Sequence, residues 1–288
     1  MIETLTLTNL VNSNSFVFND DNCPLNQWTM DVDLRSEDRE RPLEHGLYPS
    51  YTYYGRRIFH GEGALLDDTP TGYMTRRLQL QSALILPPRS GFREPFQLDM
   101  RYAGIVPTLR SYCTLDAYPE LPMATPNWSL TEFFISLKSF DPVMYDATTY
   151  STTAPTPAIV PGVSFPLTFP ILFFGTTAAT VLSHNSGNIL TYPTVTIYGP
   201  VTNPRIYNIA KDEIVRLDGL ILNNGDAVTV DFKDRTAISS AGGNTYATIT
   251  NDSTFWTLDP GDNQWTFTAD AAASPSRAVM TWNDAYML

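Results

Sequence analysis

The chain has 288 residues, enough for one large domain or two of ordinary size, and its formal charge of −12 makes nucleic-acid binding unfavourable. An apolar content of 43% excludes a disordered chain, and 22 prolines indicate many short elements joined by turns. No segment predicts membrane insertion, and the first ten residues predict a strand and not a signal peptide.

Polar and apolar residues alternate with a period of two in much of the first half, which predicts strands with one buried face. The pattern covers residues 4–7, 28–34, 77–81 and 132–138, and we also favour a strand within 95–106. A run rich in Thr, Ser, Pro and Ala then lacks any packing pattern. We therefore predict a first domain at residues 1–147, a linker at 148–161 and a second domain at 162–288.

Short strands at nearly regular spacing are predicted in the second half. They cover residues 194–198, 205–208, 213–217, 227–232, 246–249, 265–269 and 278–282. Segments rich in Asn, Gly, Asp and Pro, at 223–226, 241–244 and 259–263, have the composition of tight turns. This spacing predicts an all-β fold in which the second domain is a β-sandwich or jelly roll.

Few residues suggest catalysis. The three histidines, His45, His60 and His184, are better interpreted as surface or turn residues than as catalytic bases, and no G-x-S-x-G elbow occurs. Cys23 and Cys113 lack the spacing of a zinc site or a disulfide framework. Adjacent carboxylates on a strand point to opposite faces, so they are weak candidates for a glycosidase pair. We predict no enzyme activity, no metal and no cofactor.

Two other groups of residues have alternative interpretations. Asp226, Asp231 and Asp234 could form a calcium loop, but a glycine that precedes the first aspartate and a strand between them favour a β-hairpin. Tyr246 and Trp256 are candidate sugar contacts, since aromatic rings can stack on sugars. Trp265, two residues before a phenylalanine, is better interpreted as a core residue.

An ordered series of short segments resembles the distal tail protein (Dit) family of long-tailed bacteriophages. The similarity to the family's Gly-Asp turn, Val-rich strand and L-x-P-G-x-N turn lies in residues 203–207, 222–231, 235–236, 255–263 and 265–267. Weaker matches follow the family's order at residues 45–46, 54–58, 61, 76–80 and 140–145. Residues 89–122 match poorly, so no interface is assigned to them.

The resemblance implies two β-sandwich domains: an N-terminal tail-tube-like domain that closes into a hexameric ring, and a C-terminal galectin-like domain. It implies a structural virion protein at the distal end of the tail, assembled in the bacterial cytoplasm. The expected partners are five further copies, the tail tube protein, the tail-tip hub protein and receptor-binding proteins. DNA would only pass through the channel, and no membrane is involved.

We predict that Gly55, Arg56 and Arg57 contribute to the ring interface, because arginines at that position could pair with acids of the next subunit. Two alternatives stay open. The first is a carbohydrate-binding protein that recognises cell-wall sugars through Tyr246 or Trp256, and the second, ranked last, is a glycosidase.

Overall fold

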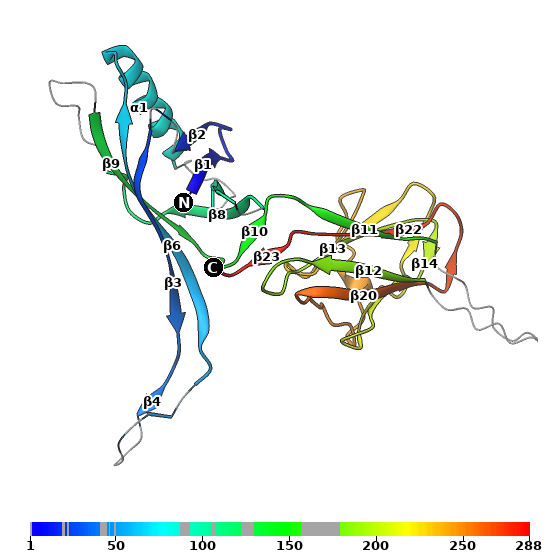
Figure 1. Ribbon diagram of the computed structural model, residues 1–288. Coiled ribbons are helices and arrows are strands. Elements are labelled where there is room, and N and C mark those ends of the chain that lie inside the picture. Colours follow the sequence, from blue (N-terminus) through cyan, green and yellow to red (C-terminus); the bar gives the residue numbers. More distant parts are fainter. Residues whose placement is uncertain are drawn as a thin grey trace, which may run out of the picture. The chain divides into compact units, whose positions relative to one another are not determined.

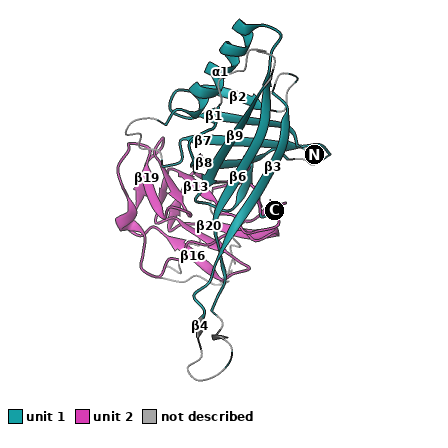
Figure 2. Cartoon of the chain, turned by 90° about the vertical axis from the view of Figure 1, so that its left-hand side faces the viewer, with its two compact units in different colours: residues 1–147, 287–288 teal, residues 148–286 magenta. Residues whose placement is uncertain are grey.

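The computed structural model describes residues 2–18, 21, 23–40, 45, 47–48, 50–86, 93–104, 107–121, 130–156 and 179–288. The chain forms two compact units (Figure 1, Figure 2). Unit 1 contains Met1–Ala147 and Met287–Leu288, and unit 2 contains Thr148–Tyr286. The chain therefore passes from unit 1 to unit 2 and back again.

Unit 1 is built on an antiparallel sheet with the strand order β2-β1-β7-β8-β9-β6-β3. Its strands are β1 (Ile2–Asn9), β2 (Ser15–Phe18), β3 (Leu25–Arg35), β6 (Tyr53–Leu66), β7 (Phe96–Tyr102), β8 (Leu109–Leu115) and β9 (Leu130–Ser139), with β10 (Met144–Asp146) paired to β8. Two short strands, β4 (Arg39–Glu40) and β5 (Leu47–Tyr48), pair with each other. The predicted strands at 4–7, 28–34 and 132–138 are confirmed, and the segment 95–106, for which a strand was favoured, contains β7.

The core of unit 1 follows from the alternation in its strands. Leu5 and Leu7 on β1 stand opposite Met100 and Leu98 on β7, and all four side chains are fully buried. Burial of such side chains stabilises the fold by roughly 1.5–3 kcal/mol each. Every second residue of β1 and β7 therefore fixes the register of the pair.

The predicted strand at residues 77–81 is wrong, because these residues lie in helix α1 (Pro70–Leu84). Thr69 caps the helix by accepting a hydrogen bond from the Gly72 amide at 3.1 Å, and Pro70 occupies the first turn. Leu80 is fully buried whereas Leu78 is exposed, although both would face the same side of a strand. The alternation was too short to outweigh the Thr-Pro start signal.

Unit 2 is a sandwich of two antiparallel sheets, and the predicted all-β class is confirmed for the chain, with α1 as its helix. The first sheet has the order β11-β22-β13-β18-β19 and the second β12-β20-β15-β16, with a small sheet β17-β14-β21. The bounds are β11 (Tyr150–Ala154), β12 (Thr180–Asn185), β13 (Thr194–Tyr198), β14 (Val201–Thr202), β15 (Arg205–Asn208), β16 (Glu213–Arg216), β17 (Ile221–Leu222), β18 (Ala227–Asp231), β19 (Thr236–Ser239), β20 (Gly261–Thr268), β21 (Ala271–Ala272), β22 (Arg277–Trp282) and β23 (Ala285–Tyr286).

The sandwich core combines inward side chains from both sheets. Val195 and Met280 from the first sheet and Ile206 and Trp265 from the second are all fully buried in one cluster. The indole nitrogen of Trp265 donates a hydrogen bond to the Ser183 hydroxyl at 3.0 Å, so its polar atom is satisfied inside the core. The prediction of Trp265 as a core residue is confirmed.

Two predictions in this half need correction. Part of the predicted linker, Tyr150–Ala154, forms β11, which pairs with β22 from Tyr150↔Trp282 to Ala154↔Ala278. The predicted strand at 246–249 is instead a short 3-10 helix, η1 (Tyr246–Thr248), followed by a single bridge between Ile249 and Leu217. The rest of the predicted linker from residue 157 on lies outside the described residues.

Candidate functional site

The two ends of the unit 1 sheet present free edges among the described strands. The edge strands are β2, with four residues, and β3, with eleven. An exposed strand edge offers unpaired amide and carbonyl groups to another chain, so natural proteins cover it or pair it. The long β3 edge therefore makes unit 1 suited to pairing with a neighbouring chain.

Two of the predicted ring residues lie next to this edge, on β6. The Arg56 side chain is half-exposed, and its Nε donates to Asp33 Oδ2 on β3 at 2.8 Å. A second acid, Asp116, lies 3.8 Å from Nη1. Hydrogen bonding and charge attraction from Asp33 raise the pKa of Arg56 above its ordinary value. At Gly55, an added Cβ atom would lie 3.1 Å from the Asp33 carbonyl oxygen, so glycine allows the two strands to approach closely.

Arg57 has a different role from the one predicted. Its side chain is fully buried, because alternation along β6 turns it to the face opposite Arg56. Nε donates to the Pro142 carbonyl at 2.7 Å, Nη1 to the Leu288 carbonyl at 3.3 Å, and Nη2 contacts Met287 Sδ at 3.3 Å. Burial lowers the pKa of Arg57. Arg57 therefore anchors residues 287–288 inside unit 1 and offers nothing to a neighbouring subunit.

Beyond the body of the sheet, β3 and β6 continue as a two-stranded ribbon (Figure 1). The β6–β9 pairing begins at Arg57↔Ser139, whereas the β3–β6 pairing extends to Leu34↔Tyr54 and Arg35↔Tyr53. We call the described residues 33–40 and 50–55 the arm. Its apolar residues were not predicted as functional, although the run Tyr-Thr-Tyr-Tyr at 51–54 could have indicated an exposed aromatic surface.

The candidate sugar contacts are separated by the structure. Trp256 is only 2% exposed and packs edge-on against Phe232 with ring centroids 4.9 Å apart, so it cannot meet a sugar and that prediction is wrong. Tyr246 is 46% exposed, and it lines a shallow hollow with Arg235 and Asn244. One of the two predicted aromatic contacts is therefore accessible.

His60 and His184 contact side chains on neighbouring strands. His60 on β6 stacks on Phe134 of β9, with ring centroids 5.9 Å apart. His184 Nδ1 lies 2.6 Å from Asp262 Oδ1 across the β12–β20 pair, and both side chains are exposed. His45 is exposed. Among the described residues, no group of three or more His, Cys, Asp and Glu side chains could hold a metal ion, and no described helix is long and apolar enough to cross a membrane.

The three aspartates of the candidate calcium loop form a hairpin. Asp226 Oδ2 accepts hydrogen bonds from the backbone and side-chain nitrogens of Asn223 at 2.9 and 3.1 Å. Asp231 Oδ1 accepts from the amides of Lys233 and Asp234, both at 2.8 Å, where β18 turns into β19. The hairpin interpretation is confirmed, since two of the three carboxylates close the turns on either side of β18.

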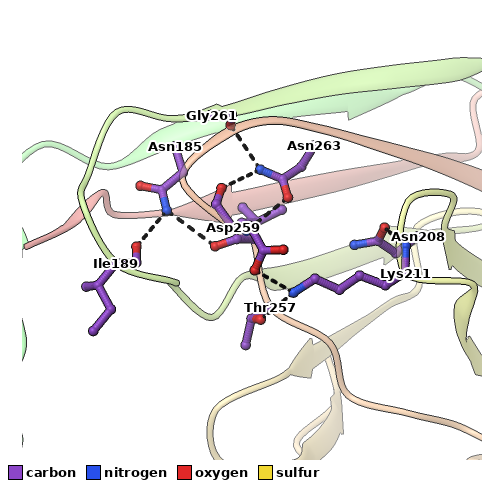
Figure 3. A network of polar contacts seen from close by, with 9 residues as sticks. Asn185, Ile189, Asn208, Lys211, Thr257, Asp259, Gly261 and Asn263 are labelled. Carbon is purple, nitrogen blue, oxygen red and sulfur yellow. Dashed lines mark hydrogen bonds and ion pairs between the residues drawn. The ribbon is translucent and has the colours of Figure 1, made fainter.

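The Leu-Asp-Pro-Gly-Asp-Asn segment at residues 258–263 is explained by a polar network in unit 2 (Figure 3). Asn263 donates from Nδ2 to the carbonyls of Asp259 at 2.7 Å and Gly261 at 3.0 Å, and its Oδ1 accepts from the Asp259 amide at 2.9 Å. Gly261 adopts a φ of +94°, a region that favours glycine. Leu258 is fully buried and exchanges backbone hydrogen bonds with Thr191.

Side chains from neighbouring elements complete this network (Figure 3). Asn185 Nδ2 donates to the carbonyls of Ile189 at 3.0 Å and Leu258 at 3.3 Å. Lys211 Nζ donates to Thr257 Oγ1 and to Asp259 Oδ1, each at 2.7 Å. These hydrogen bonds tie the segment to residues 185–189 and to Lys211. The motif therefore has an architectural role: it starts β20 and fixes the turn before it.

Comparison with known proteins identifies this unit. Residues 186–286 match the family described as siphovirus-type tail component, C-terminal domain. Unit 2 is similar to this tail component domain over those residues. The match contains the Leu258–Asn263 turn, which the sequence had shown to be similar to distal tail proteins. No curated protein matches the sequence.

Solved structures extend the likeness from the tail component domain to the whole chain. The crystal structure of the Dit protein of phage SPP1, described as a paradigm of the hub adsorption apparatus in phages that infect Gram-positive hosts, is 11% identical and has a TM-score of 0.66. The phage P2 baseplate in its activated conformation gives TM-scores of 0.52 with Ca and 0.50 with Sr, at 8% and 9% identity. Each likeness covers 98% of both chains. The shared fold and the tail component domain confirm the predicted resemblance to distal tail proteins.

Proposed function

We propose that the protein is a structural component of the distal end of a phage tail, in which unit 1 of six copies closes into a ring. The likeness to a Dit protein over 98% of the chain carries this proposal, since it includes both units in one order. The free β2 and β3 edges of unit 1 support it, because a closed ring removes the exposed edges that a single copy leaves open.

In this proposal the ring joins the tail tube protein to the tail-tip hub protein, and unit 2 offers a surface for receptor-binding proteins. The work is mechanical, and no reaction is involved. DNA passes through the ring without being bound, in keeping with a formal charge of −12, which opposes attraction to phosphates. The virion tail is the expected location, after assembly in the host cytoplasm.

Native mass spectrometry of the purified protein tests the ring. One chain has a mass of 32.1 kDa, so six copies give 6 × 32.1, or 192.6 kDa. A dominant species of that mass at micromolar concentration is the expected result. If the mass stays at 32.1 kDa at every protein concentration from micromolar to 100-fold above it, the proposal is overturned.

The predicted ring residue Arg56 permits a more local test. Arg56→Glu would place a third acid beside Asp33 and Asp116 at the β3 edge. In the predicted interface this cluster of acids would repel the acids of the next subunit, so we expect the variant to dissociate at a protein concentration at least tenfold higher than that of the parent, as measured by light scattering. Arg101→Glu is the matched control, because Arg101 is exposed and pairs with Glu3 on the β1–β7 face. Equal dissociation of both variants would remove Arg56 from the interface.

A second candidate function is carbohydrate binding by unit 2, and the hollow at Tyr246 favours it. The exposed ring could stack on a sugar, while Arg235 and Asn244 could donate hydrogen bonds to its hydroxyls. Isothermal titration of the full chain with cell-wall polysaccharide tests this function. Binding heat that disappears in Tyr246→Ala but persists in Tyr192→Ala, at another exposed tyrosine, would support it. The absence of heat in the parent would exclude it.

A further inference from the structure

The arm, residues 33–40 and 50–55, needs a partner to be stable. Its strands pair only with each other in the described residues beyond Arg57↔Ser139, where β9 ends. A two-stranded ribbon by itself is at best marginally stable in water. The hydrogen bonds at its base, such as Arg56 to Asp33 at 2.8 Å, are at the surface and contribute less than about 1 kcal/mol each.

The arm also exposes apolar side chains. Leu34, Tyr53 and Tyr54 are more than half exposed, and Tyr51 is 83% exposed. Single exposed apolar residues are normal on a protein surface, but four on one narrow ribbon are typical of an interaction site. Tyrosine is common in interfaces because it buries a large ring at a small cost in conformational entropy.

A groove of matching chemistry lies beside the end of α1. It is lined mainly by Leu84, Ile85, Leu86, Leu115, Tyr118 and Leu121. Ile85 and Leu86 are at least half exposed and Tyr118 is 89% exposed. Only Leu84 of the six is fully covered by the chain itself. Among the described residues the groove is lined mostly by apolar side chains that stay partly exposed.

The arm and helix α1, whose C-terminal end lines the groove, lie apart along unit 1. In both views α1 stands at one end of the long β3–β6 hairpin and β4, within the arm, at the other (Figure 1, Figure 2). The arm of one copy therefore cannot fill the groove of the same copy. Two different, mutually complementary surfaces on one chain make a head-to-tail contact between copies, which closes into a ring when the rotation allows.

Charge favours the same pairing. Glu37 and Asp38 lie between β3 and β4, where the Ser50 amide donates to Asp38 at 2.8 Å, and the four acids of residues 33–40 outnumber the two arginines there. Arg77 lines the groove, and its Nη2 donates to the Leu121 carbonyl at 2.8 Å. Opposite charges on the two surfaces would attract a neighbouring copy and help to set its orientation.

We propose that the arm of one copy docks in the α1 groove of a second copy of the same chain, with Leu34 and Tyr54, which are cross-strand partners on one face of the ribbon, against the apolar walls. This contact rests on the proposed ring and gives it a named interface in addition to the sheet edges. It explains why a ribbon with four exposed apolar side chains persists in the fold.

Cysteine cross-linking tests the contact. In the double variant Tyr54→Cys/Tyr118→Cys, oxidation should link each arm to the next groove and produce a ladder of covalent multimers on a non-reducing gel. The native Cys23 and Cys113 are fully buried and should not contribute. Each single variant should give no ladder. Tyr54→Cys/Tyr112→Cys is the matched control, because Tyr112 is exposed on β8 and alternation turns it away from the side of Leu115.

The outcomes separate this proposal from the ring itself. A ladder in the first double variant alone supports arm docking. If native mass spectrometry shows six copies but no ladder forms, or the control gives an equal ladder, arm docking is overturned and the proposed ring is unaffected. A monomeric parent protein would overturn both. As a second measurement, Leu34→Asp should raise the concentration for half-dissociation at least tenfold without changing the circular dichroism spectrum, and an unchanged concentration would count against the contact.

Discussion

The side chain of Asn263 permits a sharp test of why the L-x-P-G-x-N turn has its sequence. Its amide donates two hydrogen bonds, at 2.7 and 3.0 Å, and accepts one at 2.9 Å, all within residues 259–263. Asn263→Ala removes all three hydrogen bonds. Asn263→Asp keeps the shape of the side chain but replaces the donating nitrogen with an oxygen that faces two carbonyl oxygens.

The expected magnitude follows from the count of hydrogen bonds. Each contributes about 1 kcal/mol net, so Asn263→Ala should lower the free energy of unfolding of unit 2 by about 2–3 kcal/mol. With roughly 3–4 °C per kcal/mol for a domain of this size, the melting temperature should fall by about 6–12 °C. Asn263→Asp should cost at least as much at pH 7, since it adds repulsion between oxygens.

The dependence on pH gives the Asp variant its own signature. The facing carbonyls should raise the folded-state pKa of the new carboxyl above its unfolded value, because only its protonated form can donate a hydrogen bond. Its destabilising effect should therefore be complete at neutral pH and shrink as the pH falls through about 5. The alanine variant should lack this recovery.

Thermal unfolding followed by tryptophan fluorescence is a suitable assay, because three of the five tryptophans, Trp256, Trp265 and Trp282, lie in unit 2. Asp262→Asn is the matched control: it makes the reverse swap at an exposed neighbour and should change stability by less than about 0.5 kcal/mol. If the Asn263 variants melt within 1–2 °C of this control, on the order of 0.5 kcal/mol, the turn does not depend on the amide and the reasoning is refuted.

Three further predictions concern Arg57, Gly187 and Cys113. Arg57→Met should lower the free energy of unfolding of unit 1 by about 2–4 kcal/mol in urea, because buried carbonyl acceptors lose a charged donor. Arg57→Lys should recover part of this loss. If both variants lower the free energy of unfolding equally, the geometry of the guanidinium hydrogen bonds does not matter. Gly187→Ala should lower the free energy of unfolding of unit 2 by more than about 2 kcal/mol, since the added Cβ would overlap the Ala285 backbone. Gly243→Ala is the control: the nearest atom to its added Cβ is 3.3 Å away, so the free energy of unfolding should change by less than about 0.5 kcal/mol. Burial, with the nearby Glu94 charge, raises the pKa of the Cys113 thiol well above its ordinary value, so a thiol reagent at pH 8 should label it only after unfolding. The free energy of unfolding should fall as the pH rises past about 8.5, where the thiol of the unfolded chain ionises. Rapid labelling of the native protein would show that the core opens.

Much of the strand arrangement could be predicted because one face of each strand is buried. The predicted ranges at 194–198, 205–208 and 278–282 agree with β13, β15 and β22, where buried residues alternate along the chain. β11 was missed for the opposite reason. Its Thr-rich sequence has no apolar pattern, and its pairing with β22, more than a hundred residues away, cannot be seen locally.

The candidate site was predicted less well, because the face of a side chain depends on what covers it. Arg56 and Arg57 are neighbours with the same chemistry, yet alternation places one at the surface and the other in the interior. Trp256 gave no strand signal, and its burial against Phe232 depends on tertiary packing. The groove beside α1 was not predicted, since the helix itself was mistaken for a strand. The Leu258–Asn263 turn could be recognised because its hydrogen bonds are local.

The Arg57 site has a consequence for the order of events during synthesis. Unit 2 is inserted in the chain between residue 147 and residue 287 of unit 1, so the two residues that contact the Arg57 guanidinium leave the ribosome after all of unit 2. The interior of unit 1 is therefore completed last, although most of its sequence is made first. A nascent chain that stalls within unit 2 would hold an arginine in an incompletely covered interior, and cellular quality control could distinguish it from a finished chain.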